Sequence, residues 1–451
     1  MERVTSLSPT RNLYMKHSVV GIILGIFSLI QSHAQKVTIE EVIQIALQKN
    51  YDVQVIQATS AIAANDNRYS FGAFLPLINA TGSYIKTNTN SHNITFSDVE
   101  TIREGAKSSI TNGAVQAIWT LFDGTKMFAT RKRIEELAAL GEVNVRNQMM
   151  NTTAAIITTY YSIIRQKQQL TAIQELMAVS EERVKLAERK LHVGTGGKPE
   201  LLQAKVDLNA QRTATLAQET LIQQLKDQMN GLLAMSLPDV YDVGDSIPIN
   251  LTLTMDEVLS NIEKTNQTLV VAKKNIDVAE LVLRENRSSR SLIINLTSAY
   301  NYGKTENELA TSPVSQKYTQ NQGYNYGLTM AVPIMNGMNV NRLIGQAKIN
   351  LQRQKLIYDQ QLTLALVGVR NAFVNYDNAK KALLIEDENI VLAKENVTIA
   401  FEGFKRGITT FIELRTAQQS LADAYNRLIA ARYLAKVSET ELLRLKGSLL
   451  N

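Results

Sequence analysis

The stretch "KLHVGTGGKPELLQAK" (Lys190–Lys205) comes nearest to a motif with chemistry of its own, a glycine-rich loop followed by a lysine. A phosphate-binding P-loop requires the pattern G-x-x-x-x-G-K-[ST], because its backbone N–H groups surround the phosphates and its hydroxyl holds the metal ion. Here His192 stands where the first glycine is required, and Pro199 stands where the hydroxyl is required. The stretch also follows a helical pattern rather than a strand. No nucleotide site is predicted.

Other reactive residue types are missing or scattered. Cysteine is absent, which excludes disulfides, thiolate metal sites, a cysteine nucleophile and a lipid anchor on an N-terminal cysteine. There is no paired-carboxylate, histidine-based or nucleophile-elbow arrangement, and the 48 basic residues barely exceed the 42 acidic ones. We therefore predict no enzyme, no cofactor, no metal site and no nucleic-acid partner. The histidines lie far apart without ligand spacing: His17, His33, His92 and His192.

The N-terminal segment indicates export. Within "MKHSVVGIILGIFSLIQSHAQ" a basic start precedes an apolar run from Val19 to Ile30, and small residues follow at Ser32 and Ala34. This order is typical of a signal peptide, and we predict one over residues 1–34. The apolar run is shorter than the about 20 residues of a membrane span, so a membrane anchor is the weaker alternative.

Internal similarity predicts a duplicated chain. "TIEEVIQIALQKN" (Thr38–Asn50) reappears as "TMDEVLSNIEKTN" (Thr254–Asn266), and further pairs follow in the same order. We predict a first structural repeat over 35–236, a linker over 237–253 and a second repeat over 254–451. The further pairs are Phe74–Tyr84 with Arg290–Tyr300, Trp119–Gly124 with Val332–Gly337, and Leu191–Leu208 with Phe404–Leu421.

Each repeat contains a very long helical run. Apolar residues recur every seven positions, which keeps one seam facing a partner helix and implies left-handed supercoiling. Proline is absent from 124–193 and from 337–407. A helix of 70 residues would be about 105 Å long, more than a compact domain needs. The seams are Met149, Ile156, Ile163, Leu170, Met177, Val184 and Leu191, then Leu362, Val369, Tyr376, Leu383, Ile390, Val397 and Phe404, then Leu414, Leu421, Leu428, Ala435, Leu442 and Leu449.

Glycines separate each long run from the next helix. Gly194 and Gly407 lie where the chain must reverse, and glycine supplies the left-handed conformation that ends a helix. Pro199 suits the first turn of the following helix. The glycine-rich stretch is therefore predicted to be the turn of a helical hairpin.

Four strand-like pieces, two in each repeat, alternate between apolar and polar residues. Each is close to the about 9–11 residues that cross a bilayer as a tilted strand, and aromatic residues gather in them as at membrane interfaces. The polar stretches 86–109 and 303–322 are predicted to be outside loops. The apolar stripes include Ile78–Tyr84, Val115–Leu121, Leu292–Tyr302 and Tyr324–Val332, and the predicted interface aromatics are Tyr84, Trp119, Tyr300, Tyr302, Tyr324 and Tyr326.

Four strands cannot close a barrel, because unpaired strand edges in lipid cost several kcal/mol per group. Bacterial barrels begin at about eight strands, so at least two copies of the chain must each contribute four. The predicted fold class is thus an α+β membrane protein with long coiled-coil helical hairpins and four transmembrane strands per chain.

On these residues the chain resembles the TolC-like outer-membrane efflux protein family, or outer membrane factors, over about residues 36–449. "WTLFDG" and "VPIMNG" look like the strand-to-helix junction of that family, and "FKRGITTFIELRTAQQSL" looks like its tip motif. The resemblance implies a homotrimer with a twelve-stranded β-barrel in the outer-membrane lipid of a Gram-negative bacterium, and an α-barrel tunnel in the periplasm. It also implies that a periplasmic adaptor protein, which links an inner-membrane transporter, docks on the hairpin tips. The tip residues are Gly194, Thr195, Gly196, Gly407 and Ile408.

The resemblance also implies a periplasmic aperture. Family members carry acidic residues six and nine positions after the second tip glycine, where this chain has Glu413 and Thr416. The arginine that family members carry two residues after this glycine is replaced by Thr409. Glu413 is either an aperture carboxylate or a helix N-terminal acid favoured by the helix dipole, and the equivalent Glu200 of the first repeat favours the dipole.

We expect a passive exit duct, in which the channel performs no chemistry and the inner-membrane partner supplies the energy. The alternative is an exported structural or adaptor coiled-coil protein without a pore. An enzymatic function would be supported only by the glycine-rich stretch, which does not meet the P-loop pattern. The exported substrate, whether drug, metal ion or polypeptide, stays open.

Overall fold

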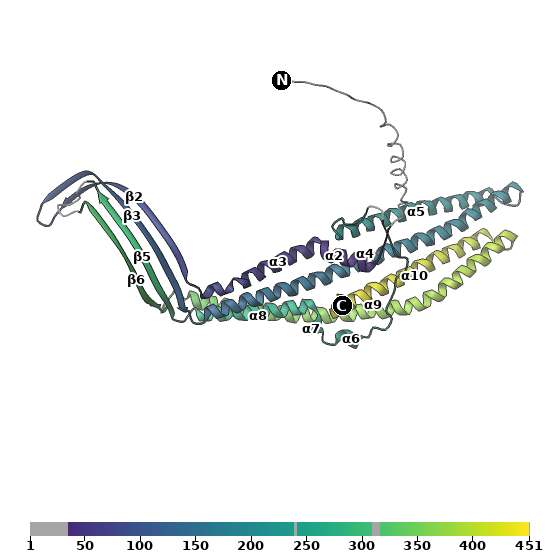
Figure 1. Cartoon of the computed structure of the whole chain (residues 1–451). Coiled ribbons are helices and arrows are strands. Elements are labelled where there is room, and N and C mark those ends of the chain that lie inside the picture. Colours follow the sequence, from purple (N-terminus) through teal and green to yellow (C-terminus); the bar gives the residue numbers. More distant parts are fainter. Residues whose placement is uncertain (1–34, 239–240, 309–315, 451) are drawn as a thin grey trace, which may run out of the picture.

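A computed structural model describes residues 35–238, 241–308 and 316–450 of the chain. The predicted signal peptide, 1–34, lies outside the described residues. Figure 1 shows an elongated molecule with a β-sheet at one end and long helices at the other. The long elements are α3 (Tyr51–Arg68), β2 (Leu77–Ile94), β3 (Glu100–Phe122), α4 (Lys126–His192), α5 (Lys198–Leu232), α8 (Gln267–Ser288), β5 (Ile293–Asn307), β6 (Tyr318–Ala331), α9 (Asn339–Arg406) and α10 (Phe411–Lys446).

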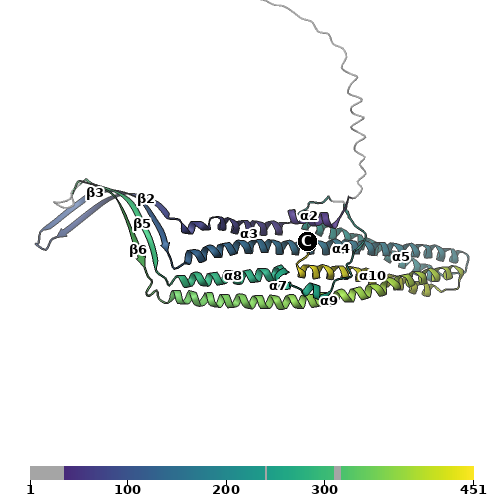
Figure 2. The same ribbon diagram turned by 60° about the horizontal axis from the view of Figure 1, so that its bottom comes forward.

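The two predicted long helices are confirmed. Helix α4 has 67 residues and α9 has 68, and each runs from the sheet to a hairpin turn. Near the sheet the packing order is α3, α4, α8, α9, which Figure 2 shows side by side. Near the turns the order is α5, α4, α10, α9. Helix α9 therefore forms one edge of the molecule throughout, and α3 and then α5 form the other.

The seven-residue seams lie between packed helices, as predicted. Ile156 and Ile163 of α4 and Val369 of α9 are fully buried, and no seam residue is among the exposed ones. Because the seams bury apolar residues along two very long helices, the helices stay together over their whole length without a globular core. The last seam, in α10, is buried at Leu414, Leu421, Leu428, Ala435 and Leu442.

Both strand-to-helix junctions use left-handed backbone. Gly124 (φ 71°) and Thr125 (φ 72°) precede α4, and Gly337 (φ 64°) and Met338 (φ 62°) precede α9. At Gly124 a Cβ atom would lie 2.2 Å from Cβ of Ser291, so that glycine also permits a close approach of the second repeat. The duplicated junctions thus turn both strand pairs into the long helices in the same way.

The four strands form one antiparallel sheet in the order β2-β3-β5-β6. The prediction of a loop over 86–109 was wrong: β2 continues to Ile94, β3 begins at Glu100, and the backbone N–H of Thr95 donates to the carbonyl of Val99 across a tight turn (3.1 Å). Similarly, β5 continues to Asn307 and β6 begins at Tyr318, within the predicted loop over 303–322. Polar residues such as threonine suit a strand that has solvent on both faces, so polarity alone did not indicate a loop.

Short elements cover the middle of the bundle. They include β1 (Gln35–Val37), α2 (Ile39–Lys49), β4 (Tyr241–Val243), α6 (Met255–Leu259) and α7 (Ile262–Thr265), whereas η1 (Ser70–Phe74) lies where the helices meet the sheet. Strand β4 lies in the predicted linker and pairs in parallel with β1. Nζ of Lys167 on α4 reaches Asp242 and Asp245, each at 2.8 Å, and holds this pair of strands against the bundle. In the parts of the chain that the structure describes, no helix is both long and apolar enough to cross a bilayer.

Candidate functional site

The two hairpin turns have the same hydrogen bonding. At the end of α9 the N–H of Gly407 donates to the carbonyl of Phe404 (3.3 Å) and the N–H of Ile408 to that of Gly403 (2.9 Å). At the end of α4, Gly194 and Thr195 repeat both bonds, and Gly194 and Gly407 share a φ of 75°. This arrangement is the Schellman motif, which needs a residue in the left-handed region. The predicted role of both glycines as helix terminators is confirmed.

Two further glycines permit close packing within the turns. A Cβ atom on Gly196 would lie 2.8 Å from Cβ of Lys190, and one on Gly403 would lie 2.1 Å from Oγ1 of Thr409. Gly196 was among the predicted tip residues, whereas Gly403 was not. The turn after α9 therefore places Thr409 directly over the last turn of that helix.

Glu413 takes part in a capping box at the start of α10. Its carboxylate accepts from the backbone N–H (2.7 Å) and the hydroxyl (3.0 Å) of Thr410, whose hydroxyl in turn accepts from the N–H of Glu413 (3.2 Å). These bonds from Thr410 lower the pKa of Glu413 below its ordinary value. Glu413 thus stays ionised and has the local role that the sequence left open. Glu200, its equivalent in α5, follows the N-cap Gly197, which offers no side chain for such a box.

The predicted aperture residues Thr409, Glu413 and Thr416 line one shallow groove between α9 and α10. Asn396 and Ile399 of α9 complete its wall. The side chain of Glu413 is exposed, so its charge faces solvent as well as the cap. The three positions are therefore adjacent, and their place at an aperture stays a prediction.

Arg183 of α4 is the most deeply buried charged residue among the described ones, with 1% exposure. Its Nη2 lies 2.7 Å from Oδ2 of Asp207 on α5, and its Nη1 donates to Oε1 of Gln418 on α10 (2.8 Å). Its guanidinium lies 5.0 Å from the ring centre of Phe411. Burial lowers the pKa of Arg183, and the charge of Asp207 opposes that shift. The pair therefore joins the two helices of the first hairpin, and the bond from Arg183 to Gln418 ties that hairpin to the second one near the turns.

The sequence analysis missed this pair. In the second repeat, Asn396 and Ser420 occupy the positions equivalent to Arg183 and Asp207, and both line the Glu413 groove. The residue pattern of α4 could have indicated the pair. Ser180 and Arg183 are polar residues at helical spacing within an otherwise apolar stripe that includes Leu176 and Ala187. A polar residue on such a stripe marks either a buried partner or a functional position.

A cleft lies between the ends of α4 and α9, and we call it the tip cleft. It is lined by the predicted tip residues Thr195 and Gly407 and by basic side chains of both helices. Nζ of Lys190 donates to the carbonyl of Phe404 (2.9 Å) and lies 3.9 Å from the centre of its ring. The other predicted tip residue of this turn, Ile408, is 77% exposed.

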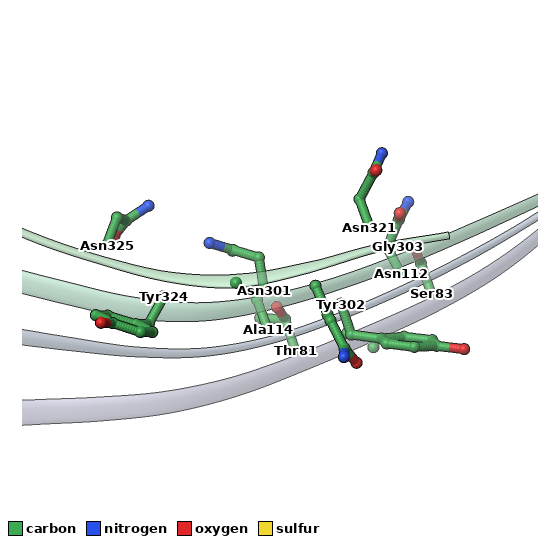
Figure 3. A pocket seen from close by; sticks show the side chains of 14 residues that line it. Thr81, Ser83, Asn112, Ala114, Asn301, Tyr302, Gly303, Asn321, Tyr324 and Asn325 are labelled. Atoms are coloured by element: carbon green, nitrogen blue, oxygen red, sulfur yellow. The ribbon is translucent and has the colours of Figure 1, made fainter. Parts of the chain in front are cut away.

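The sheet separates apolar from amide side chains. Across the strands, Ala80, Val115, Tyr300 and Tyr324 lie opposite one another in one row, and the neighbouring row contains Asn301. Figure 3 shows Asn301, Asn321 and Asn325 on one side of the strands and Tyr302 and Tyr324 on the other. The predicted alternation is confirmed. Residues 77–85, 110–122, 293–303 and 319–331 contain no charged side chain, so both faces are neutral along this length.

The predicted interface aromatics lie on the apolar face. Tyr84, Tyr324 and Tyr326 are well exposed, at 63, 78 and 77%, as unpartnered residues on an open surface would be. Trp119 lies at the end of the sheet near the helices, where its Nε1 donates to the carbonyl of Phe74 (2.9 Å). Their contact with lipid stays a prediction. Among the described residues, no group of three or more histidine, aspartate or glutamate side chains is arranged to hold a metal ion.

Comparisons with known proteins agree on one family. A family model described as "Outer membrane efflux protein" matches residues 42–234 and 258–448. "Outer membrane protein TolC" of Salmonella enteritidis is 20% identical over 361 residues, which cover 79% of this chain and 72% of that protein. The protein of the same name from Vibrio cholerae is 21% identical over 386 residues, 84% of each chain. Among solved structures, CusC matches with a TM-score of 0.75 and 17% identity over 93% of this chain and 96% of that one.

Proposed function

Because the chain belongs to the outer membrane efflux protein family, we propose that three copies of it form the passive exit duct of a tripartite export system. The family match confirms the predicted family and its place in the outer membrane. The proposal adds the trimer, the pore, and the partners: a periplasmic adaptor and an inner-membrane transporter. The transporter supplies the energy, and the duct itself performs no chemistry.

The observation that carries the proposal is the sheet with two different faces and two open edges. Strands β2 and β6 are the edges of the order β2-β3-β5-β6, and each has one unpaired side. An open edge cannot persist in lipid, where no water satisfies the backbone groups, so β6 of one copy must pair with β2 of the next. When the ring closes with the apolar face outward, the asparagine face lines a water-filled interior.

The helices support the same closure. Helix α9 is an edge of the bundle and exposes apolar residues that recur at seven-residue spacing, a pattern that demands a partner helix. The opposite edge, α3 near the sheet and α5 near the turns, exposes apolar residues of its own. The α9 residues are Ile349 and Leu356, Val367 and Val374, and Ile385, Leu392 and Ile399; those of the opposite edge are Val55, Ile62, Tyr69, Leu202, Val206 and Leu216.

The copy number follows from the family resemblance. Each chain contributes a four-stranded sheet, so three chains supply the twelve strands of the family's barrel. The hairpin turns then lie at the far end of the helical tunnel, about 100 Å from the sheet for helices of this length. We place the adaptor at these turns, with Gly194, Thr195, Gly196, Gly407 and Ile408 as docking residues, because they are the parts of the duct nearest the inner membrane.

We also propose that Glu413 contributes to the aperture. Three copies around the axis would bring three ionised carboxylates together, with Thr416 and Thr409 beside them. A ring of like charges with low-dielectric walls attracts cations. Opening would be an outward movement of the tips, with each glycine turn moving as a unit.

Conductance of the purified protein in planar bilayers tests the proposal. We expect wild-type protein to form cation-preferring channels, and we expect Glu413→Ala to lower the cation preference several-fold. Glu200→Ala is the matched control, because it removes the same carboxylate from the equivalent helix turn outside the groove. Absence of any channel current from a protein extracted with the outer membrane would refute the pore.

The alternative without a pore makes a different prediction. An exported coiled-coil protein would have no use for a neutral sheet with an amide face and an apolar face. Heat-modifiable migration on gels separates the two, because a closed barrel resists unfolding in detergent until it is heated. A chain that migrates identically with and without heating would favour the alternative.

A further inference from the structure

The tip cleft is strongly basic. Among the residues that line it, Lys185, Arg189, Lys190, Lys405 and Arg406 are positively charged, His192 can become so, and the acids are Glu182 and Glu188. The basic residues come from both helices, α4 and α9. The cleft therefore spans the two hairpins of one chain and carries an excess of positive charge.

Several of these charges already have a partner. Lys185 lies 2.7 Å from Glu182, Lys405 lies 2.6 Å from Glu402, and Glu188 pairs with Lys205 at 2.8 Å. Over the described ranges, the ion pairs include neither Arg189 nor Arg406. Both arginines are exposed. The charge of Arg189 acts on Glu182 and that of Arg406 acts on Glu402, but neither guanidinium is held in an ion pair there, so both can bind a further partner.

A local explanation accounts for only part of this charge. Basic side chains in the last turn of a helix are stabilised by the negative end of the helix dipole. Lys190 plays that part visibly, since it donates to the carbonyl of Phe404 at the end of α9. Within the part of the chain that the structure describes, the Nε of Arg189 donates a long hydrogen bond of 3.4 Å to the carbonyl of Lys185, one turn back on its own helix. The helix dipole therefore accounts for the position of Lys190, but it accounts less well for Arg189 and Arg406, which are exposed on the two sides of the tip cleft.

We propose that the tip cleft receives an acidic segment of the periplasmic adaptor, held by Arg189 and Arg406. This inference rests on the proposed function, which places the adaptor at the hairpin turns, and it adds the chemistry of the docking segment. Arginine suits the role because its planar fork of N–H donors binds a carboxylate through two hydrogen bonds. A segment with two or more carboxylates would bridge α4 and α9 and would fix the distance between the two hairpins.

The test uses the full-length trimer in detergent and two synthetic helical-hairpin peptides. One peptide carries glutamates at its turn, and the other carries glutamines at the same positions. We expect wild-type protein to bind the glutamate peptide at least tenfold more tightly, and this preference to weaken as salt is raised from 0.05 to 0.5 M, since screening shortens the reach of the charges. Fluorescence anisotropy of labelled peptide gives both affinities.

Variants assign the preference to the cleft. Arg189→Gln with Arg406→Gln should remove the tenfold preference, and Arg189→Lys with Arg406→Lys should keep part of it. The control, Lys264→Gln with Lys273→Gln on α7 and α8, removes equal charge far from the cleft and should change nothing. Equal binding of the two peptides by wild-type protein, or a preference that survives the double glutamine variant, would overturn the inference.

Channel conductance separates this inference from the proposed function. The double glutamine variant should conduct like the wild type, because neither arginine lines the Glu413 groove. A conducting channel without peptide preference would refute the acidic docking segment alone. Binding of a short soluble polyglutamate as tight as that of the hairpin would also overturn it, because it would show a general anion site.

Discussion

At the scale of single residues, Arg183 is the most deeply buried charge among the described residues, and Asp207 is its counter-charge. Asp207 has other partners, since Gln203 donates to its Oδ1 (2.9 Å) and Nε of Arg415 lies 3.4 Å from its Oδ2. Besides Asp207, Arg183 contacts the uncharged Gln418 and the ring of Phe411, and its Nε has no hydrogen-bond partner among the described residues. The two members of the pair should therefore respond differently to removal.

We expect Asp207→Ala to destabilise the protein by about 3–5 kcal/mol, because it leaves a buried guanidinium without a counter-charge. Arg183→Met should cost less, since Asp207 can turn to Arg415 and a methionine fills most of the space. Apparent melting temperatures of the detergent-solubilised protein, followed by circular dichroism, give the ranking. The exposed partner provides the control: Arg415→Met should shift the midpoint little. A larger loss for Arg183→Met than for Asp207→Ala would contradict this account.

The pH response of the channel should follow Glu413. The hydrogen bonds from Thr410 lower the pKa of Glu413, so in the folded single chain its carboxylate gains a proton only at a pH below the ordinary glutamate pKa. The contribution of this cap to stability is complete above the unfolded pKa and is lost as the pH falls through the lower, folded one. We expect cation preference, measured from reversal potentials, to disappear over that same acidic interval. Glu413→Gln should show a flat profile there, and a titration near neutral pH would point to another group.

At the scale of elements, the helical hairpins depend on two left-handed glycines. Gly407→Ala and Gly194→Ala should each cost about 1–2 kcal/mol, because an L-residue at a φ of 75° brings its Cβ too close to the backbone. Asparagine at either position should cost less than alanine, since it tolerates this conformation. The midpoint of urea unfolding, followed by helical circular dichroism, measures both effects.

A glycine elsewhere provides the contrast. Gly231 lies in α5, and a Cβ atom added there would meet nothing within 4 Å. Gly231→Ala should be neutral or should stabilise by roughly 0.5–1 kcal/mol, because alanine loses less backbone freedom in a helix. If the alanine variants at all three glycines behaved alike, the left-handed turns would not be what holds the hairpins.

The sequence predicted those elements whose periodicity reports on their surroundings. The seven-residue seams predicted α4, α9 and α10, because the seam residues are buried or half-buried against a helix that the same pattern requires. The strand ends were missed, because polar residues such as Thr87, which lies opposite Ser108, leave no apolar alternation to read in a solvated strand. The parallel pairing of β1 with β4 was missed as well. Each of these strands has three residues, too short to show any period, and their contact joins positions about 200 residues apart.

The candidate site was predictable to the extent that it is local. The turns followed from Gly194 and Gly407, since a helix end is determined by a few neighbouring residues. The sequence allowed two roles for Glu413, an aperture carboxylate or a helix N-terminal acid. It could not decide between them, because the cap with Thr410 is local, whereas an aperture needs other copies of the chain. The Arg183 pair depends on three helices meeting, which no single stretch encodes. The same is true of the tip cleft, whose basic residues come from two distant helix ends.

At the scale of the whole molecule, both the sheet and the helical bundle of a single chain have two open edges. Strand β6 and helix α9 lie on one side, and strand β2 with α3 and α5 lies on the other. Closure therefore satisfies backbone groups in the sheet and covers apolar stripes on the helices in one step. Assembly and barrel formation should be a single event for this reason, and a defect in the helical interface should also prevent closure of the barrel.

Charge placed on the α9 stripe tests that coupling. Ile385 and Leu392 are 60 and 56% exposed in the single chain and lie seven residues apart on the edge helix. Ile385→Glu with Leu392→Glu would bury two unpaired carboxylates on assembly, at a cost of several kcal/mol per group. We expect the trimer fraction, measured by light scattering after size exclusion, to fall at least tenfold, and the heat-modifiable band to disappear with it. Gln419→Glu adds charge to α10, which lies between α4 and α9 rather than at an edge, and should leave both readouts unchanged. If the double variant lost its trimer but kept a heat-modifiable barrel, the strands would close without the helices, and the edges would be independent of one another.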